Sequence, residues 1–253
     1  MIDCSHKMSI TNVTTELLET VLKDKRTLAT TSFSNVYLGY WNDKNVVVKY
    51  FHEKCLPLSR KELTLISRIE HENIIKLIAA GPSLPYSCSF LVLEYADCHS
   101  LHKCFDKFRR VKLTDFGSSV TTSYTEPSII GTLCYMAPEL WTVRSGEDVP
   151  YSEKLDVYSL TITFWELLAR QPPYKVLERR DVSDKFWSSI SKRPPILDGC
   201  PELVNNIIQS GWAVDPQSRP TMLQLNTCLC SIIEKLFPAD FDIKDIGIPE
   251  HYF

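Results

Sequence analysis

The amino-acid sequence predicts an α+β protein with a β-rich N-terminal part and a helical C-terminal part. Short β-branched and aromatic runs fill residues 27–96, and one amphipathic helix interrupts them. A long apolar run of helical character follows at 152–171. With 253 residues, 44% of them hydrophobic, the chain can form one large domain or two lobes with packed cores.

The first predicted elements are a β-hairpin and a helix. The runs SNVYLGYW at 34–41 and NVVVKYF at 45–51 are joined by a polar turn at 42–44, which is typical of a hairpin. A helix is predicted over 58–69, because its apolar residues recur at helical spacing. Its charged residues, among them Glu62, are expected to lie outside that apolar face.

Two more strands and a long helix complete the predicted elements. The runs NIIKLIAAG at 73–81 and SFLVLEYA at 89–96 flank a proline-rich turn and are typical of consecutive buried strands. The run YSEKLDVYSLTITFWELLARQ predicts a buried helix that begins near Ser152 and ends before Pro172.

Composition and charge narrow the function classes. The 28 basic and 31 acidic residues give a net charge of −3, which predicts neither nucleic acid nor a membrane as a partner. The longest apolar stretch, 157–169, is shorter than the roughly 20 residues of a spanning helix, and the N-terminus lacks the pattern of a signal peptide. Nine cysteines without a C-x-x-C pair are typical of reduced thiols. We therefore expect a cytoplasmic protein.

Three features of the first hundred residues resemble the small lobe of a protein kinase: VVVK at 46–49, Glu62, and LVLEYA at 91–96. In that family the strand lysine holds the α- and β-phosphates of ATP and is fixed by a glutamate on the following helix. The resemblance therefore implies these roles for Lys49 and Glu62, although a lysine that ends an apolar strand is commonplace by itself. The other residues that the resemblance places around ATP are Leu28, Val36, Val47, Leu93, Glu94 and Ala96.

The phosphate-covering loop departs from the family pattern. Kinases use G-x-G-x-x-G, so that the backbone can approach the phosphates without a Cβ in the way. Here Ala29, Thr31 and Ser34 stand at the three glycine positions, and Val47 replaces the alanine of V-A-I-K. Each added side chain restricts the backbone and projects bulk toward the nucleotide. The resemblance implies ATP and Mg²⁺ as cofactors, and we expect their binding to be weak or absent.

Two motifs in the second half support the resemblance. Asp115-Phe116-Gly117 and Ala137-Pro138-Glu139 are separated by an activation-loop length, 25 residues counting Asp115 and Glu139. The resemblance implies that Asp115 coordinates the Mg²⁺ that bridges the phosphates. The phrase GTLCYMAPE resembles serine/threonine kinases more than tyrosine kinases. Arg219, in GWAVDPQSRPTM, is expected to form a structural ion pair with Glu139.

Hydroxyl residues between these two motifs are candidate phosphorylation sites. A phosphate there could order the loop against a basic residue. The alternative is a solvated polar loop, which is favoured because the chain has no R-D arginine in the expected place to receive the phosphate. The candidates are Thr121, Thr122, Ser123, Thr125 and Ser128.

The interval between Glu94 and Asp115 is too short for the family pattern. It holds 20 residues, where the pattern requires two helices and an H-R-D-x-x-x-x-N loop that carries the catalytic aspartate and an asparagine metal ligand. A single helix of 20 residues, about 30 Å long, would use the whole interval. Asp97 does not substitute, because His102 stands where the asparagine should be. We therefore identify no catalytic residue and expect a large lobe without its early helices and catalytic loop.

This loss is expected to affect folding. In the family the missing helix packs against the helix at 152–171, so its loss should expose apolar side chains there. The side chains concerned are Leu160, Ile162, Phe164 and Leu167. Asp156 should also lack its usual catalytic-loop partners. In addition, Thr161 replaces a glycine usual in this helix, and Gly211 stands where a cysteine commonly precedes Trp212.

Weaker identities from about residue 20 to about 242 most resemble the transforming-growth-factor-β-activated kinases, a group of MAP kinase kinase kinases. The segments that carry this resemblance include SRIEHENIIKL, EYADCHSL and YMAPE. It implies protein partners, either MAP kinase kinases or kinase-activating adaptors. The expected domains are an N-terminal tail at 1–20, a small lobe with connector at 21–96, an incomplete large lobe at 97–236 and a C-terminal tail at 237–253.

Three interpretations remain open at this point. The chain is a pseudokinase or truncated isoform that acts by protein binding in stress-kinase signalling. Alternatively, it is an active ATP-dependent serine/threonine kinase whose sequence here omits an internal segment. In the third interpretation it is an unstable remnant without function. The changed glycine loop counts against the second interpretation, because it lies outside the short interval.

Overall fold

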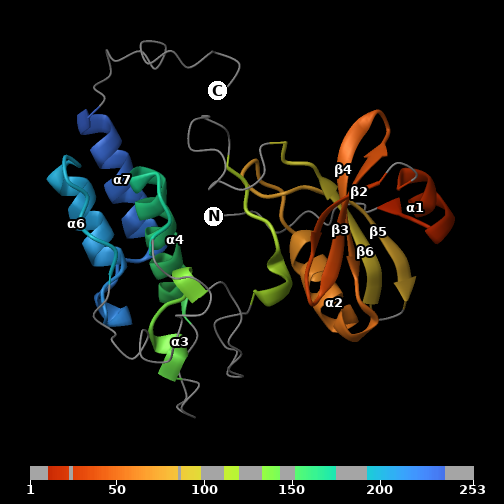
Figure 1. Ribbon diagram of the computed structural model, residues 1–253, viewed down its shortest axis with the longest axis horizontal. Coiled ribbons are helices and arrows are strands. Elements are labelled where there is room, and N and C mark those ends of the chain that lie inside the picture. Colours follow the sequence, from red (N-terminus) through yellow and green to blue (C-terminus); the bar gives the residue numbers. More distant parts are fainter. Residues whose placement is uncertain are drawn as a thin grey trace. The chain divides into compact units, whose positions relative to one another are not determined.

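The structure is a computed structural model in which the chain divides into two compact units. Unit 1 comprises residues 1–99 and 109–119, and unit 2 comprises residues 100–108 and 120–253 (Figure 1). The residues that the structure describes are 11–22, 25–84, 87–97, 111–119, 133–142, 152–174 and 193–236. The expected α+β architecture is present, with a sheet in unit 1 and a helical unit 2.

The described part of unit 1 contains a six-stranded sheet with the order β1-β5-β6-β4-β3-β2. All neighbouring strands pair antiparallel except β1, which pairs parallel with β5. The predicted hairpin is confirmed, because β3 and β4 are joined by a tight turn in which Asn42 and Asp43 have φ angles of 49° and 62°. The strands are β1 Thr11–Asn12, β2 Arg26–Thr30, β3 Ser34–Trp41, β4 Lys44–Phe51, β5 Leu77–Leu84 and β6 Ser87–Glu94. Strand β5 runs through Pro82, beyond the start of the expected turn.

A helix packs against each face of this sheet. Side chains alternate along each strand, so Val46 and Val48 of β4 join one core cluster, which Leu18 of helix α1 (Thr15–Val21) completes. The other face packs against α2 (Leu56–Ile66) through Ile66, which contacts a second cluster that includes Leu91. By the same alternation Lys49 of β4 lies on the face that α2 covers.

The segment at 1–20, expected to be a tail, contributes β1 and most of α1 in its described part. The backbone N–H of Val13 donates to the carbonyl of Ala80 at 3.0 Å, and Val13 and Leu18 are both buried. The chain passes so close to β5 that a Cβ on Gly81 would lie 2.1 Å from the Val13 carbonyl oxygen. Glycine at this position therefore allows the N-terminal segment to pair with the sheet.

Helix α2 corrects one prediction. It begins two residues earlier than expected, with Pro57 in its first turn, and it ends at Ile66. Its buried side chains are Ser59, Glu62 and Ile66, so the prediction that Glu62 lies outside the buried face was wrong. Positions three and four residues apart share one face of a helix, and this places Glu62 in the same buried row as Ile66.

The described part of unit 2 is helical. The predicted long helix is confirmed as α4, which the Ser152 side chain caps by accepting from the backbone N–H of Lys154 at 3.3 Å. It ends where Arg170 takes a left-handed conformation with φ 51°. The other helices are α3 Glu139–Thr142, α6 Glu202–Gly211 and α7 Met222–Leu236, and α4 spans Glu153–Ala169.

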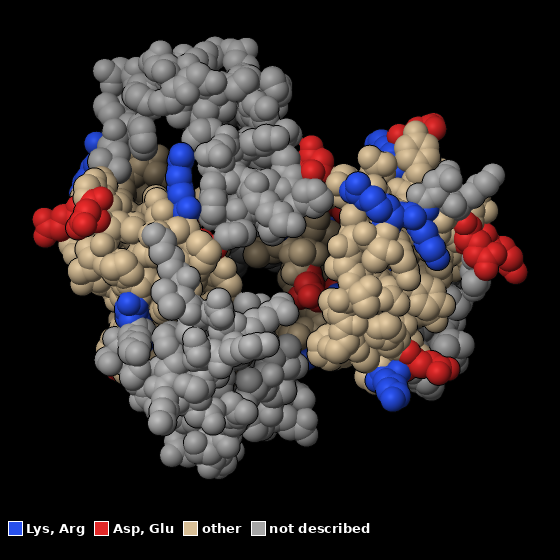
Figure 2. Space-filling model, in the orientation of Figure 1, with Lys and Arg blue, Asp and Glu red and all other residues tan. Residues whose placement is uncertain are grey.

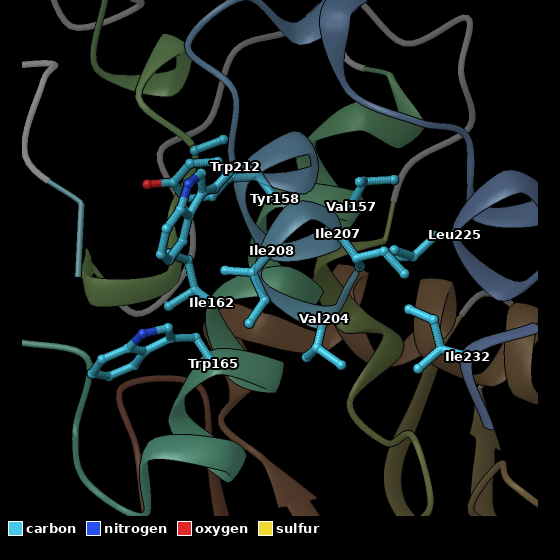
Figure 3. Close-up of a cluster of buried hydrophobic side chains, with 11 residues drawn as sticks. Val157, Tyr158, Ile162, Trp165, Val204, Ile207, Ile208, Trp212, Leu225 and Ile232 are labelled. Carbon is cyan, nitrogen blue, oxygen red and sulfur yellow. The ribbon is translucent and has the colours of Figure 1, made fainter. Parts of the chain in front are cut away.

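The core of unit 2 lies between α4, α6 and α7. Figure 3 shows Ile162 and Trp165 of α4 grouped with Ile208 of α6, and Leu225 and Ile232 of α7 lie in the same cluster. Leu160 is 45% exposed, as expected. The expectation was wrong for Ile162, which is fully buried because it faces α6 rather than solvent, and Phe164 and Leu167 are half-buried. Asp156 is exposed.

Thr161 and Gly211, the two departures from the family pattern in this core, fit each other. Thr161 is 2% exposed, and its hydroxyl donates to the Val157 carbonyl at 2.7 Å. A Cβ on residue 211 would lie 2.1 Å from Thr161 Oγ1. The threonine side chain therefore occupies the space that a larger residue at 211 would need.

The described surface carries both charge signs. Figure 2 shows Lys and Arg interspersed with Asp and Glu on the described part of the face in view, in keeping with the net charge of −3. Among the helices that the structure describes, none has the length and apolar character needed to cross a bilayer.

Candidate functional site

Three of the predicted charged residues meet in unit 1. The ammonium Nζ of Lys49 lies 2.7 Å from Glu62 Oε2 and 2.7 Å from Asp115 Oδ1. The Lys49 side chain is 13% exposed, Glu62 is 1% exposed, and Asp115 is 70% exposed. The site is therefore a buried ion pair with a second carboxylate at its solvent side.

The sheet and α2 hold the buried pair. Lys49 stands on β4 between Val36 of β3 and Leu91 of β6, so strands on both sides fix its backbone. Glu62 is directed to the same face because it shares the buried row of α2 with Ile66, whose packing on the sheet orients the helix. The pair thus depends on secondary structure rather than on a loop.

Asp115 is placed by a segment that docks beside β5. The backbone N–H of Leu113 donates to the Asn73 carbonyl at 2.7 Å, and Leu113 accepts from the backbone N–H of Ile75 at 2.9 Å. Within this segment Leu113 also forms one isolated parallel bridge with Ile74. Asp115 then takes a left-handed conformation, φ 67° and ψ 69°, which aspartate adopts more readily than most residues. Phe116, next in the chain, packs on the same core cluster as α2.

The charges of the site are coupled. Burial lowers the pKa of Lys49, but the Glu62 and Asp115 carboxylates outweigh burial and hold this pKa above its ordinary value. Burial raises the pKa of Glu62, and the Lys49 ammonium offsets only part of that effect. The Lys49 ammonium is therefore the partner of both the Glu62 and the Asp115 carboxylate. The three side chains together carry a net negative charge when all are ionised.

Of the other residues expected around ATP, some are paired across neighbouring strands of the sheet. Val47 of β4 pairs with Leu93 of β6, and Val36 lies opposite Lys49. Leu28 is half-buried and Ala96 is exposed. Val36, Val47 and Leu93 therefore lie on the neighbouring strands β3, β4 and β6, whereas Ala96 follows the end of β6.

Glu94, which the resemblance places around ATP, forms a salt bridge and a backbone contact in the structure. Its carboxylate lies 2.6 Å from Lys112 Nζ and accepts from the backbone N–H of Lys76 at 2.8 Å. Sequence reasoning missed Lys112, because a contact between residues 18 positions apart leaves no periodic signal. The backbone N–H of Glu94 also donates to the Lys76 carbonyl, at 3.0 Å. Both ends of the short interval are thus attached to the segment at 73–76.

Among the described residues, Asp115 is the one to which the resemblance gives a role in holding Mg²⁺. Asp115 is bonded to Lys49, and within the described ranges no group of three or more His, Cys, Asp or Glu residues is arranged to hold a metal ion. A protein-bound Mg²⁺ in a phosphate site draws its ligands from one or two carboxylates and from the phosphates themselves. In the turn at 31–34, which would cover the phosphates, the backbone N–H groups of Phe33 and Ser34 are bonded to Thr31. We therefore derive no step through the metal or the nucleotide.

In unit 2 the expected partners Glu139 and Arg219 lie together. Arg219 donates to both carboxylate oxygens of Glu139, at 2.6 and 2.8 Å, and is 2% exposed. Its guanidinium also lies 5.0 Å from the ring centre of Tyr158. A buried, bidentate pair of this kind joins the start of α3 to the loop before α7. The hydroxyl candidates at 121–128 lie outside the described residues.

The family model and the relatives described below are all protein kinases. Residues 104–228 match the protein kinase domain model. A probable serine/threonine-protein kinase of Dictyostelium discoideum is 30% identical over 260 positions, which cover 83% of this chain and 28% of that protein. Mitogen-activated protein kinase kinase kinase 7 of Drosophila melanogaster is 26% identical over 259 positions, covering 83% and 37%. Dual specificity protein kinase shkC of D. discoideum is 26% identical over 275 positions, covering 86% and 53%. The chain thus spans about a quarter to a half of the length of these relatives.

The first two alignments are longer than the part of this chain that they cover. They run over 260 and 259 positions, whereas 83% of 253 residues is about 210, so about 50 positions in each alignment have no residue of this chain opposite them.

Proposed function

The chain belongs to the protein kinase superfamily, and on that premise we propose that it binds proteins in a stress-kinase cascade without transferring phosphate. Its partners would be MAP kinase kinases or kinase-activating adaptors in the cytoplasm. The observation that carries the proposal is the interval of 20 residues between Glu94 and Asp115. The ends of this interval are held by the contacts of Glu94 and Lys112.

A proton acceptor for the substrate hydroxyl is the missing part. Such a base must come within about 2.6–3.2 Å of the hydroxyl, directly or through one water. The interval contains two carboxylates, Asp97 and Asp106. Neither is followed five residues later by the asparagine of the family pattern, since His102 and Val111 stand there. Proton transfer and the second metal ligand are therefore lost together.

The retained parts support a role in binding. The Lys49–Glu62 pair keeps α2 attached to the sheet, and the Glu139–Arg219 pair fixes the start of α3. In active kinases the position of the helix that carries the glutamate is what other proteins and phosphates control. A chain that holds this helix in place through its own ion pairs can present a kinase-like surface without performing the reaction.

The test is a transfer assay on the whole chain. Purified protein is incubated with γ-labelled ATP, Mg²⁺ or Mn²⁺, and either a general basic protein substrate or an inactive MAP kinase kinase. We expect label incorporation equal to that of the Asp115→Ala variant. Label incorporation by the natural chain that exceeds incorporation by the Asp115→Ala variant would overturn the proposal. Binding is measured with the same MAP kinase kinase by calorimetry, where we expect an interaction that ATP does not change.

A second candidate is an active serine/threonine kinase, because the Lys49–Glu62 ion pair is one that phosphate transfer needs. In that case the natural product has a longer interval between residues 94 and 115. Sequencing of the transcript across codons 95–114 separates the two candidates, as does a peptide that spans residues 104–112 in the endogenous protein. A continuous reading frame favours the binding protein.

A further inference from the structure

The turn between β2 and β3 is closed by a side chain of its own. The hydroxyl oxygen of Thr31 accepts from the backbone N–H of Phe33 at 3.2 Å and from that of Ser34 at 3.0 Å. The same hydroxyl donates to the Ser34 carbonyl oxygen at 3.1 Å. A threonine hydroxyl has one proton and two lone pairs, so all three are used within the turn.

The rest of the turn is also satisfied by protein groups. The backbone N–H of Thr31 donates to the Ser34 carbonyl at 2.9 Å, and the Phe33 carbonyl accepts from the backbone N–H of His52 at 3.0 Å. The Thr31 carbonyl lies 3.2 Å from the Nε2 atom of the His52 ring. Three of the four backbone N–H groups at 31–34 are therefore bonded inside the turn, and His52 fastens the turn to the end of β4.

We propose that Thr31 acts as a built-in substitute for a nucleotide phosphate, closing this turn against nucleoside triphosphates. Oriented backbone N–H groups are what a turn offers to a phosphate oxygen, and here a hydroxyl oxygen has taken that place. A phosphate would have to displace Thr31 and break bonds that exist without any ligand. The inference deepens the proposed function and rests on it, because it names the residue that makes the turn indifferent to nucleotide.

The experiment compares the variants Thr31→Val and Thr30→Val by amide hydrogen exchange. Valine keeps the shape of threonine and removes the hydroxyl. Thr30 is the matched control, since it neighbours Thr31 and its side chain forms no hydrogen bond with the described residues. We expect the Phe33 and Ser34 amides to be protected in the natural chain. They should exchange about 2- to 10-fold faster in Thr31→Val, which corresponds to one lost hydrogen bond each. Thr30→Val should leave them unchanged.

Nucleotide provides the second arm of this experiment. Addition of Mg²⁺ and ATP should not change the exchange of the two amides in the natural chain. Free exchange in the natural chain, equal effects of the two variants, or added protection by nucleotide would each overturn the assignment of Thr31. Phosphate transfer with nucleotide-insensitive amides would overturn the proposed function and leave this assignment standing. Nucleotide-dependent protection of the two amides without phosphate transfer would overturn the assignment of Thr31 and leave the proposed function standing.

Discussion

The contact between Thr161 and Gly211 leads to a quantitative prediction about the core of unit 2. In the substitution Gly211→Ala, the new Cβ would meet Thr161 Oγ1 at 2.1 Å and Cγ2 at 3.0 Å. Neither distance is compatible with van der Waals contact, so the two helices must shift or Thr161 must change its rotamer. In the variant Thr161→Ala both of these atoms are gone, and only the mildest of the three close contacts remains, with the Cβ of residue 161 at 3.1 Å. The same Gly211→Ala change should then be largely accepted.

The size of the effect follows from two opposing contributions. Overpacking of a well-filled core costs typically 1–3 kcal/mol. Alanine is a better helix former than glycine by about 1 kcal/mol, which offsets part of that cost. We expect Gly211→Ala alone to lower the free energy of unfolding by about 0–2 kcal/mol, the difference between these two contributions. In the Thr161→Ala background most of the overpacking is relieved, so the same change should be neutral or should raise the free energy of unfolding by up to about 1 kcal/mol. The coupling energy between the two sites is then about 1–3 kcal/mol, the overpacking cost that is relieved.

The assay is urea unfolding followed by the fluorescence of Trp165 and Trp212, which lie in the same core cluster. A loss of up to about 2 kcal/mol corresponds to a midpoint shift of up to roughly 1 M urea. Ser210→Ala, at an exposed neighbouring position, is the control and should move the midpoint little. The prediction is wrong if the costs of Gly211→Ala and Thr161→Ala, measured singly, add up to the cost of the double variant within about 0.5 kcal/mol. A cooperative transition in the natural chain would itself argue against the interpretation of an unstable remnant.

Three further predictions concern other contacts. Gly81→Ala should detach the N-terminal segment, because its Cβ would meet the Val13 carbonyl at 2.1 Å; limited proteolysis should remove residues 11–22 faster, and an unchanged cleavage rate would contradict this. Tyr135→Phe should cost about 1–3 kcal/mol in the free energy of unfolding, because Glu166 loses a donor at 2.6 Å; a neutral result would show that the bond contributes nothing. Burial raises the pKa of the Cys134 thiol, so its alkylation should need a higher pH than that of the exposed α7 cysteines, and equal pH profiles would be contrary evidence.

The elements with strong periodicity could be predicted from the sequence, and those that depend on distant contacts could not. Helix α4 has a capping serine, a long apolar run and a proline stop, all of which are local signals. Strand β1 has two residues and exists because it pairs with β5 near Ala80, some 70 positions away in the chain. No pattern within residues 1–20 contains that information.

The residues of the candidate site could likewise be predicted only in part from the sequence. Resemblance to kinases identified Glu62, whereas the apolar periodicity of its helix placed it on the wrong face, because periodicity counts every carboxylate as solvent-exposed. At Thr31 the sequence indicated only added bulk in place of glycine. The structure adds that its hydroxyl bonds the backbone of the turn, a local role that the residue type allows but does not require.

The most direct test of the central claim is the rate of γ-phosphate transfer by the 253-residue chain at saturating Mg²⁺ and ATP. An active kinase turns over at about 1–100 s⁻¹. We expect a rate that is indistinguishable from that of the Asp115→Ala variant, because the interval at 95–114 supplies no proton acceptor with its metal-binding asparagine. A rate within the active range, abolished by that substitution, would show that the chain is an active kinase.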